Sequence, residues 1–282
     1  MITKYSHHLS VLAILTAALL AGPGFGDSRT ALPLAPVATY ADLADLADGT
    51  PLVVRAQPRK IAQVDAARAR GLRAGWGRFY VEARTEALIS GNAPLGEALR
   101  YLVDLPLDAK GKPLAIKKKS VVVFARPVAG RPGELQLVAP DAQLLWDPAL
   151  DARIKGVLRE LFAPGAPQRI SGVNEAVHVN GDLAGAGETQ IFLVSGNGEP
   201  AAISVSRTPG SEPRWGVSFS ELVASDSAPV RDSLAWYRLA CFLPAVLPAA
   251  ANQADTLSLR DAATLDYAYV RGQLGPCTRL RH

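Results

Sequence analysis

The chain has 282 residues, of which 49% are hydrophobic and 20% are charged, and its 30 basic residues outnumber its 26 acidic ones. This length suits one large domain or two small ones and is enough to bury a real hydrophobic core. The charge balance is only mildly basic, which argues against a nucleic-acid-binding protein, because such proteins concentrate positive charge much more strongly.

Residues 1–26 have the pattern of a secretory signal peptide. A short polar start carries Lys4, an apolar run follows from Val11 to Ala21, and small residues precede a cleavage position ahead of Asp27. The apolar run has about half of the roughly 20 residues that a membrane-spanning helix needs. An uncleaved membrane anchor is the alternative, but no later segment of the sequence is long and apolar enough to span a bilayer. We therefore expect a soluble mature chain that is periplasmic or secreted.

Two cysteines, Cys241 and Cys277, are the only ones in the sequence. Exported proteins work in an oxidising environment, so an even number of cysteines favours a disulfide between them. The alternative is a pair of buried free thiols. A bridge that closes a loop of this length would stabilise the fold by about 4 kcal/mol.

The first predicted domain covers residues 27–145. Residues 27–37 are rich in alanine and proline and predict a tether, and the segment TYADLADLADG predicts a short helix that Thr39 caps and Gly49 ends. The clearest strand signal is the alternation of apolar and polar residues from Arg78 to Ser90. In all, five strands are expected: Leu52 to Val64, Phe79 to Ser90, Leu99 to Leu105, Ser120 to Val128, and Leu135 to Ala139.

Five strands with a long basic loop after the first predict a small OB-like β-barrel or a curved sheet. The helix that usually joins the third and fourth strands of an OB-fold has no counterpart in the segment LPLDAKGKPLAIKKK. Pro58, inside the first strand, removes a backbone donor, so we expect that strand to lie at a sheet edge or to carry a bulge there.

A linking helix is expected within residues 146–163, where Asp147 can cap it and Pro148 suits its first turn. Residues 164–282 then predict a small α+β domain. It holds a three-stranded meander, a weaker strand signal near Glu175 to Val179, and two C-terminal helices that the disulfide joins. The expected meander strands are Glu188 to Ser195, Ala201 to Arg207, and Arg214 to Ser220. The fold class expected for the whole chain is α+β.

Two basic clusters are the first candidates for function. Arginines and lysines dominate residues 55–78, where Asp65 is the only acidic residue, and residues 110–119 hold five of the eight lysines. Brought together at one rim of the sheet, they would form a surface that attracts anions, with Trp76 as a stacking aromatic. The alternative is a solvated loop that protects sheet edges from aggregation. The candidate anion-binding residues are Arg59, Lys60, Arg73, Trp76, Lys117, Lys118 and Lys119.

The residues of known catalytic sites are mostly missing. Apart from the terminal His282 the mature chain holds only His178, so we expect no metal site and no cofactor, and no serine lies in a GxSxG motif. A lone histidine is more often structural, but it could belong to a polar site together with Glu188, Gln190 and Arg214. Glu82 and Glu86 share a strand face and could flank a sugar as acid and base. With Arg84 between them, they more naturally form an ionic ladder on the surface.

Four strings, GRFYVEARTEAL, GETQIFL, PRWGVSF and LAWYRLACFLP, resemble segments of a group of exported, uncharacterised proteins of alphaproteobacterial type. The resemblance would cover most of the mature chain. It implies export and a shared fold, and it carries no activity, cofactor or site residue.

Together these features predict an exported binding or structural module without catalysis of its own. One alternative is a cell-envelope hydrolase or transferase with an unrecognised site, for which His178 and Glu188 are the candidate residues. Another is a protein that binds an anionic polysaccharide or lipid headgroups through the basic loops. An acidic component of the cell envelope, or an acidic protein, is the expected partner in that case.

Overall fold

The computed structural model describes residues 38–220 and 227–281, and within these ranges ten strands form two antiparallel sheets accompanied by four α-helices. Residues Pro36–His282 form one compact unit. The α+β class expected from the sequence is thus confirmed. The predicted signal peptide and tether lie outside the described residues. Within the described ranges, none of the helices combines the length and the apolar character needed to cross a membrane.

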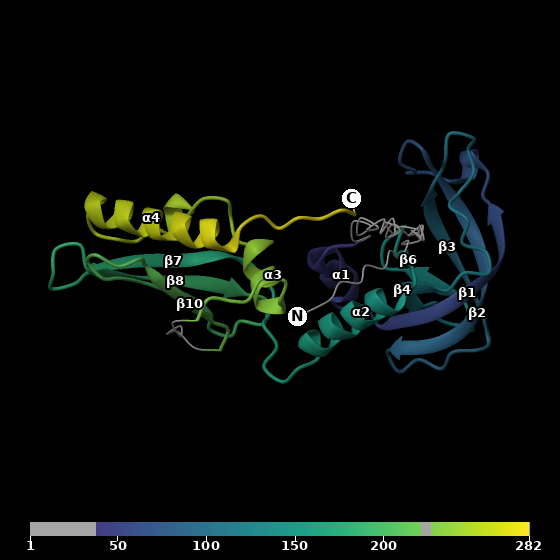
Figure 1. Cartoon of the computed structure of the whole chain (residues 1–282), viewed down its shortest axis with the longest axis horizontal. Helices are drawn as coiled ribbons and strands as arrows, with labels where there is room; N and C mark the ends of the chain where they lie inside the picture. The colour runs from purple at the N-terminus through teal and green to yellow at the C-terminus, as the bar shows by residue number, and fades with distance from the viewer. Residues whose placement is uncertain (1–37, 221–226, 282) are drawn as a thin grey trace, which may run out of the picture. The chain divides into compact units, whose positions relative to one another are not determined.

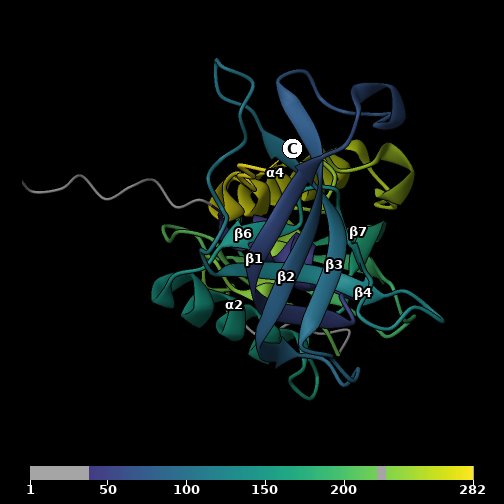
Figure 2. The same cartoon turned by 90° about the vertical axis from the view of Figure 1, so that its right-hand side faces the viewer.

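The first sheet contains six strands in the order β3-β2-β1-β4-β5, with β6 paired to β4. Figure 2 shows β1, β2 and β3 side by side, and each joins its neighbour in antiparallel register. The strands are β1 Leu52–Gln63, β2 Trp76–Ser90, β3 Ala98–Pro106, β4 Val121–Pro127, β5 Leu135–Leu137 and β6 Gln143–Leu145. The sequence pattern did not predict β6, because a strand of three residues is too short to show a period.

This sheet does not close into a barrel. Its edge strands β3 and β5 meet through one isolated parallel bridge, where the Arg100 N–H donates to the Gly133 carbonyl at 2.8 Å. Further along, the Asp104 N–H donates to the Pro140 carbonyl at 2.7 Å. A cavity of about 630 Å³ lies between the two strands. The sheet stays open, because β5 is only three residues long and does not form a ladder with β3.

The first strand, β1, lies in the middle of the sheet, between β2 and β4. Of the two alternatives predicted for Pro58, the bulge is the one observed. The register between β1 and β2 shifts between Pro58 and Lys60, which leaves Arg59 as the extra residue of a bulge. Because β4 pairs only with Leu52 to Ala56, no ladder bond is required from the Pro58 nitrogen.

The second sheet has the order β10-β9-β8-β7 and four strands instead of the predicted three-stranded meander. Bulges near Gly172 and Val173 interrupt the alternation of β7, which weakens its signal in the sequence. One face of the sheet is covered by α4 (Leu257–Leu274), which lies along β7 and β8 (Figure 1). The strands are β7 Ile170–Asn180, β8 Gly187–Ser195, β9 Ala202–Arg207 and β10 Arg214–Ser218.

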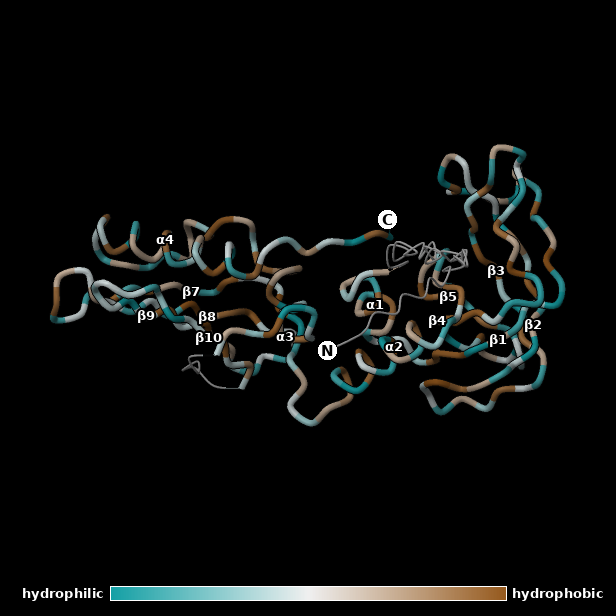
Figure 3. The backbone as a smooth tube through the Cα atoms, in the orientation of Figure 1, coloured by the Kyte–Doolittle hydropathy of each residue, from teal (hydrophilic) through white to brown (hydrophobic). Residues whose placement is uncertain are grey.

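Side-chain caps start the helices that the sequence predicted. In front of α1 (Tyr40–Ala47), Thr39 and Asp42 form a capping box, in which each side chain accepts the other's backbone N–H. The linking helix α2 (Pro148–Leu161) is capped by Asp147. Buried apolar residues of these helices and of both sheets form one continuous core. Figure 3 shows brown, hydrophobic stretches along β3 and β8, one strand from each sheet.

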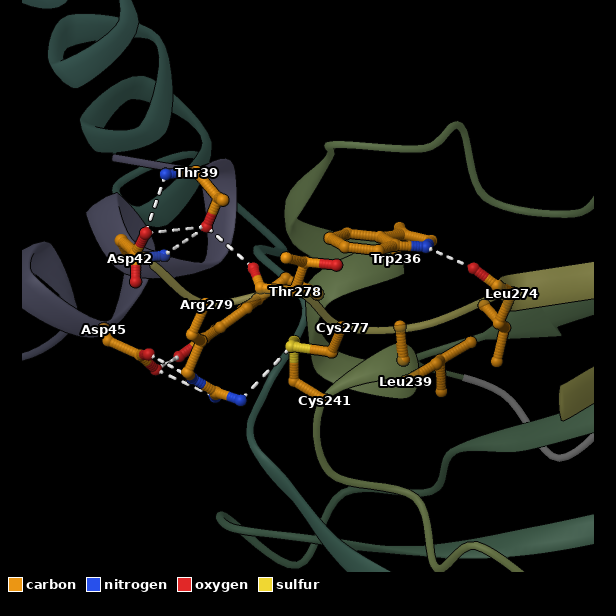
Figure 4. Close-up of a disulfide and its surroundings, with 12 residues drawn as sticks. Thr39, Asp42, Asp45, Trp236, Leu239, Cys241, Leu274, Cys277, Thr278 and Arg279 are labelled. Carbon is orange, nitrogen blue, oxygen red and sulfur yellow. Dashed lines mark hydrogen bonds and ion pairs between the residues drawn. A yellow bond between two sulfur atoms is a disulfide. The ribbon is translucent and has the colours of Figure 1, made fainter. Parts of the chain in front are cut away.

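The predicted disulfide is present and joins the ends of two helices. Cys241 follows the last residue of α3 (Leu234–Ala240), and its partner Cys277 lies just beyond α4. After the disulfide, the chain reaches α1, where the Thr39 hydroxyl donates to the Thr278 carbonyl at 2.8 Å (Figure 4). The disulfide therefore fixes the point from which the C-terminal residues run to α1.

Carboxylates of α1 hold this C-terminal tail. Arg279 donates to Asp45 at 2.6 Å, and the backbone N–H groups of Leu280 and Arg281 donate to Asp42 at 3.0 and 3.1 Å. Burial raises the pKa of Asp42, but the backbone donors outweigh it and hold the pKa below its ordinary value. One carboxylate thus caps the helix and binds the tail.

Candidate functional site

A single hydrogen bond joins the two basic segments of the sequence. The backbone N–H of Lys118 donates to the carbonyl of Pro58 at 2.9 Å. This bond holds the loop between β3 and β4 against the bulge in β1, so Lys117, Lys118 and Lys119 lie beside Arg59. All four side chains are exposed. None of them has an acidic partner among the residues that the structure describes.

The three lysines stand on a tight turn. The Lys119 N–H donates to the Ile116 carbonyl at 3.0 Å, and Lys118 adopts a left-handed conformation with φ = 64°. This is the third position of a β-turn, where glycine or asparagine is the usual residue. Ile116 is buried beneath the turn, which leaves the lysines to point into solvent.

Arg84 of β2 extends the same surface. It lies opposite Gln57 in the β1–β2 ladder and lines a cavity of about 410 Å³ together with Ser120, the residue that follows the lysines. We call this group the basic edge and define it as Arg59, Arg84, Lys117, Lys118 and Lys119.

The sequence predicted that Arg84 belongs to an ionic ladder on the surface. The cross-strand pairs show why it has no acidic partner in that ladder. Glu82 pairs with Lys60 and Glu86 pairs with Arg55, each at 3.4 Å. The two glutamates of β2 are therefore matched by two cations of β1, and Arg84 has no acidic partner in the described part of the chain. A count of the charged residues on the outer faces of the two predicted strands, residues 52–64 and 79–90, would have shown this surplus of positive charge.

Two further candidates are engaged elsewhere. The guanidinium of Arg73 lies 3.9 Å from the ring centroid of Trp76 and pairs with Asp141 at 3.0 Å. Trp76 is thus covered by Arg73 instead of being free to stack on a ligand. These residues line a separate cavity of about 470 Å³. The structure does not bring them into the basic edge.

The polar site proposed around the meander is divided between two faces of its sheet. His178 of β7 lies opposite Thr189 of β8, on the face that α4 covers. Glu188 and Gln190 flank Thr189, and successive residues of a strand point to opposite faces. Arg214 lies on their face too, since Ser206 of β9 pairs with both Glu188 and Arg214. His178 and Glu188 therefore cannot act on the same substrate.

No group of three or more His, Cys, Asp or Glu side chains in the described ranges could hold a metal ion. A comparison of the sequence with protein-family models and with curated proteins finds no match. Functional assignment therefore depends on the geometry of the sites themselves.

Proposed function

We propose that the protein is an exported binding module that holds an acidic polysaccharide of the cell envelope on its basic edge. The observation that carries this proposal is the hydrogen bond from Lys118 to Pro58, which brings the lysines of the β3–β4 loop beside Arg59 of β1. A polymer with repeated negative charges would meet several of these cations at once, so that individually weak contacts add up.

Two features favour a polysaccharide over other polyanions. The tip of the turn carries Lys117, Lys118 and Lys119, and the exposed leucine of the same loop, Leu114, lines the separate cavity of Arg73 and Trp76. An amphipathic surface that binds a bilayer would instead place apolar side chains among its cations. Non-specific sites for single-stranded nucleic acid are built on open aromatic platforms, and Trp76 is covered by Arg73.

We further propose that the first sheet is an OB-like barrel whose closure is incomplete. The strand order β3-β2-β1-β4-β5 and the parallel approach of β5 to β3 support this reading. OB-folds include proteins that bind oligosaccharides, although usually through the loops after their first and fourth strands. A periplasmic or secreted location is supported by the pattern of residues 1–26, by the disulfide and by the resemblance to exported proteins.

The proposal is tested by measuring binding to dextran sulfate, with uncharged dextran as the matched ligand. We expect binding to dextran sulfate alone, and an affinity that falls steeply as salt rises from about 50 to about 200 mM. The triple variant Lys117→Gln/Lys118→Gln/Lys119→Gln should bind about tenfold more weakly or worse, because each lysine near an anionic surface contributes about 1 kcal/mol.

Three exposed cations outside the basic edge provide the matched control. The variant Arg68→Gln/Lys110→Gln/Lys112→Gln removes the same amount of charge, and it should bind dextran sulfate like the unsubstituted protein. The proposal would be overturned if both triple variants lost the same affinity for dextran sulfate, or if the affinity did not depend on the salt concentration. Stronger binding to phosphatidylglycerol vesicles than to dextran sulfate would overturn the choice of a polysaccharide and assign the edge to lipid headgroups.

A further inference from the structure

Beneath α4, polar side chains form a connected cluster in an otherwise apolar interior. Asp266 of α4 and Thr189 of β8 are fully buried, and His178 of β7 is 6% exposed. The Thr189 hydroxyl donates to Oδ2 of Asp266, and Nδ1 of His178 lies 2.7 Å from the Thr189 oxygen. Arg207 of β9 donates from Nε to Oδ1 of the same carboxylate. Buried polar groups cost free energy unless they are paired, and this cluster holds its members in fixed positions.

The direction of these bonds decides which nitrogen of His178 carries the proton. The Asp266 carboxylate faces a guanidinium and acts as an acceptor, so the one hydrogen of the Thr189 hydroxyl is directed to it. The Thr189 oxygen can then only accept, which makes Nδ1 of His178 the donor. In the neutral imidazole Nε2 then has a free lone pair, and no described residue donates a hydrogen bond to it.

Gly187 packs against the imidazole ring of His178. A Cβ atom at Gly187 would lie 2.7 Å from Nε2 and 2.8 Å from Cε1 of His178, so the imidazole packs directly over the glycine backbone. His178 and Arg207 both line a cavity of about 500 Å³ beside the turn between β7 and β8. With Nδ1 held by Thr189, Nε2 is the ring nitrogen left to accept a hydrogen bond from a ligand.

Arg207 and His178 lie close together because both contact one carboxylate. Nε of Arg207 binds Oδ1 of Asp266, and Nδ1 of His178 is 3.5 Å from Oδ2. The terminal nitrogens of Arg207 have no acceptor among the described residues, and the side chain is 34% exposed. A guanidinium binds a carboxylate through paired hydrogen bonds, and a neutral imidazole nitrogen accepts from a hydroxyl.

We propose that this cavity binds a small hydroxy acid, such as a uronic acid monosaccharide, with its carboxylate on Arg207 and a hydroxyl donated to Nε2 of His178. Asn180 and Asp182 also line the cavity and offer polar partners to further hydroxyls. Leu265 of α4 provides an apolar wall for the carbon skeleton. The site is separate from the basic edge and does not depend on it.

The proposal is tested by calorimetric titration of the full mature chain with glucuronate at neutral pH. Two probes separate the predicted contacts: glucose has the hydroxyls without the carboxylate, and cyclohexanecarboxylate has the carboxylate on a ring of the same size without hydroxyls. Each should bind about tenfold more weakly than glucuronate, or worse, because a hydrogen-bonded contact to a fixed partner is lost.

The variant His178→Asn keeps an N–H near the position of Nδ1, so the bond to Thr189 is retained while Nε2 is removed. It should bind glucuronate about tenfold more weakly and leave cyclohexanecarboxylate unchanged. Gly187→Ala should act in the same direction, because the added methyl group displaces the ring. Glu188→Gln, which changes the adjacent residue on the opposite face of the sheet, should alter neither affinity.

The site would be overturned if glucuronate did not bind, or if glucose bound as tightly as glucuronate. It would also be overturned if His178→Asn weakened the binding of glucuronate and of cyclohexanecarboxylate to the same extent. If His178→Asn does not fold, the contact between the ligand hydroxyl and Nε2 is measured by NMR in the unsubstituted protein, as a change in the ¹⁵N chemical shift of the His178 imidazole. Glucuronate should cause that shift and cyclohexanecarboxylate should not; a shift with both, or with neither, counts against the proposal. The triple lysine variant should bind glucuronate normally, so failure here and failure at the basic edge are distinguishable.

Discussion

Lys118 occupies a backbone conformation that suits glycine better than lysine. At φ = 64°, the Cβ of an L-residue crowds the following carbonyl, a conformation that non-glycine residues rarely adopt. Its neighbour Lys117 has no such conformation. A charged residue held at a position of this kind is consistent with a role for the charge, and the two lysines allow charge to be separated from backbone strain.

We expect Lys118→Gly to leave the free energy of unfolding unchanged or to raise it by up to about 1 kcal/mol. Glycine relieves the left-handed strain, and this gain offsets its greater entropy in the unfolded chain. Lys117→Gly removes the same charge without relieving strain, so it should destabilise the fold by about 1 kcal/mol. Urea unfolding of both variants measures the difference between their free energies of unfolding. A larger loss of stability in Lys118→Gly than in Lys117→Gly would contradict the prediction. Both should weaken binding to dextran sulfate.

Among single residues, neighbours in the sequence also tend to lie together in the structure. Four of the seven anion-binding candidates, Arg59 and the three lysines, lie together in the structure. Arg73 and Trp76 were placed with them because they share a basic segment, but their stacking and the pair with Asp141 depend on a residue far away in the chain. Local composition cannot show which charges are neutralised by distant partners.

At the scale of elements, the disulfide controls how the C-terminus is held. It closes a sequence separation of 36 residues between α3 and the segment after α4, directly before the tail that binds α1. Restricting the unfolded chain in this way stabilises the folded state.

We expect Cys241→Ser/Cys277→Ser to lower the free energy of unfolding by about 4 kcal/mol, as the chain-entropy model gives for a loop of this length. Thermal and urea unfolding of the variant, and of the unsubstituted protein with and without a reductant, measure the effect. The reduced protein should match the variant. A midpoint that the reductant leaves unchanged would show that the bridge does not contribute to stability.

The strands differ in how clearly they appear in the sequence. Long strands with one buried face, such as β2, give a period of two that the eye can follow. The bulges of β7 break that period, and β6 is too short to establish one. The bulge at Arg59 was predictable because Pro58 cannot donate to a ladder, whereas the central position of β1 was not, since pairing partners lie far apart in the chain.

At the scale of the whole molecule, carboxylates of the α1 region connect distant segments. Asp48 accepts from Arg169 at 2.6 Å and from Arg238 at 2.7 Å, and Arg238 is almost fully buried. Burial raises the pKa of Asp48, but the hydrogen bonds from the two arginines outweigh it and hold the pKa below its ordinary value. The pKa of Asp42 is lowered too, by the backbone donors that include the tail.

These lowered pKa values predict a loss of stability in acid. A carboxylate whose pKa is lower in the folded than in the unfolded state stabilises the fold above the unfolded value of about 4, and that contribution is lost as pH falls through the folded pKa. Thermal unfolding midpoints should therefore drop below about pH 4. The variant Asp42→Asn/Asp48→Asn should be less stable than the unsubstituted protein at neutral pH, and its unfolding midpoint should fall less on acidification. The control Asp255→Asn/Asp261→Asn, which changes two exposed carboxylates, should show the same pH dependence as the unsubstituted protein.

The sequence by itself determined the fold class, the helix caps, the longer strands and the disulfide, because each depends on nearby residues or on the count of one residue type. Only the tertiary structure decided that the first sheet stays open, that Lys118 meets Pro58, and that His178 shares a cluster with Thr189 and Asp266. Those outcomes depend on strand order and on pairings between residues far apart in the chain. Local periodicity carries no information about such pairings, and for that reason both proposed sites lie where distant segments meet.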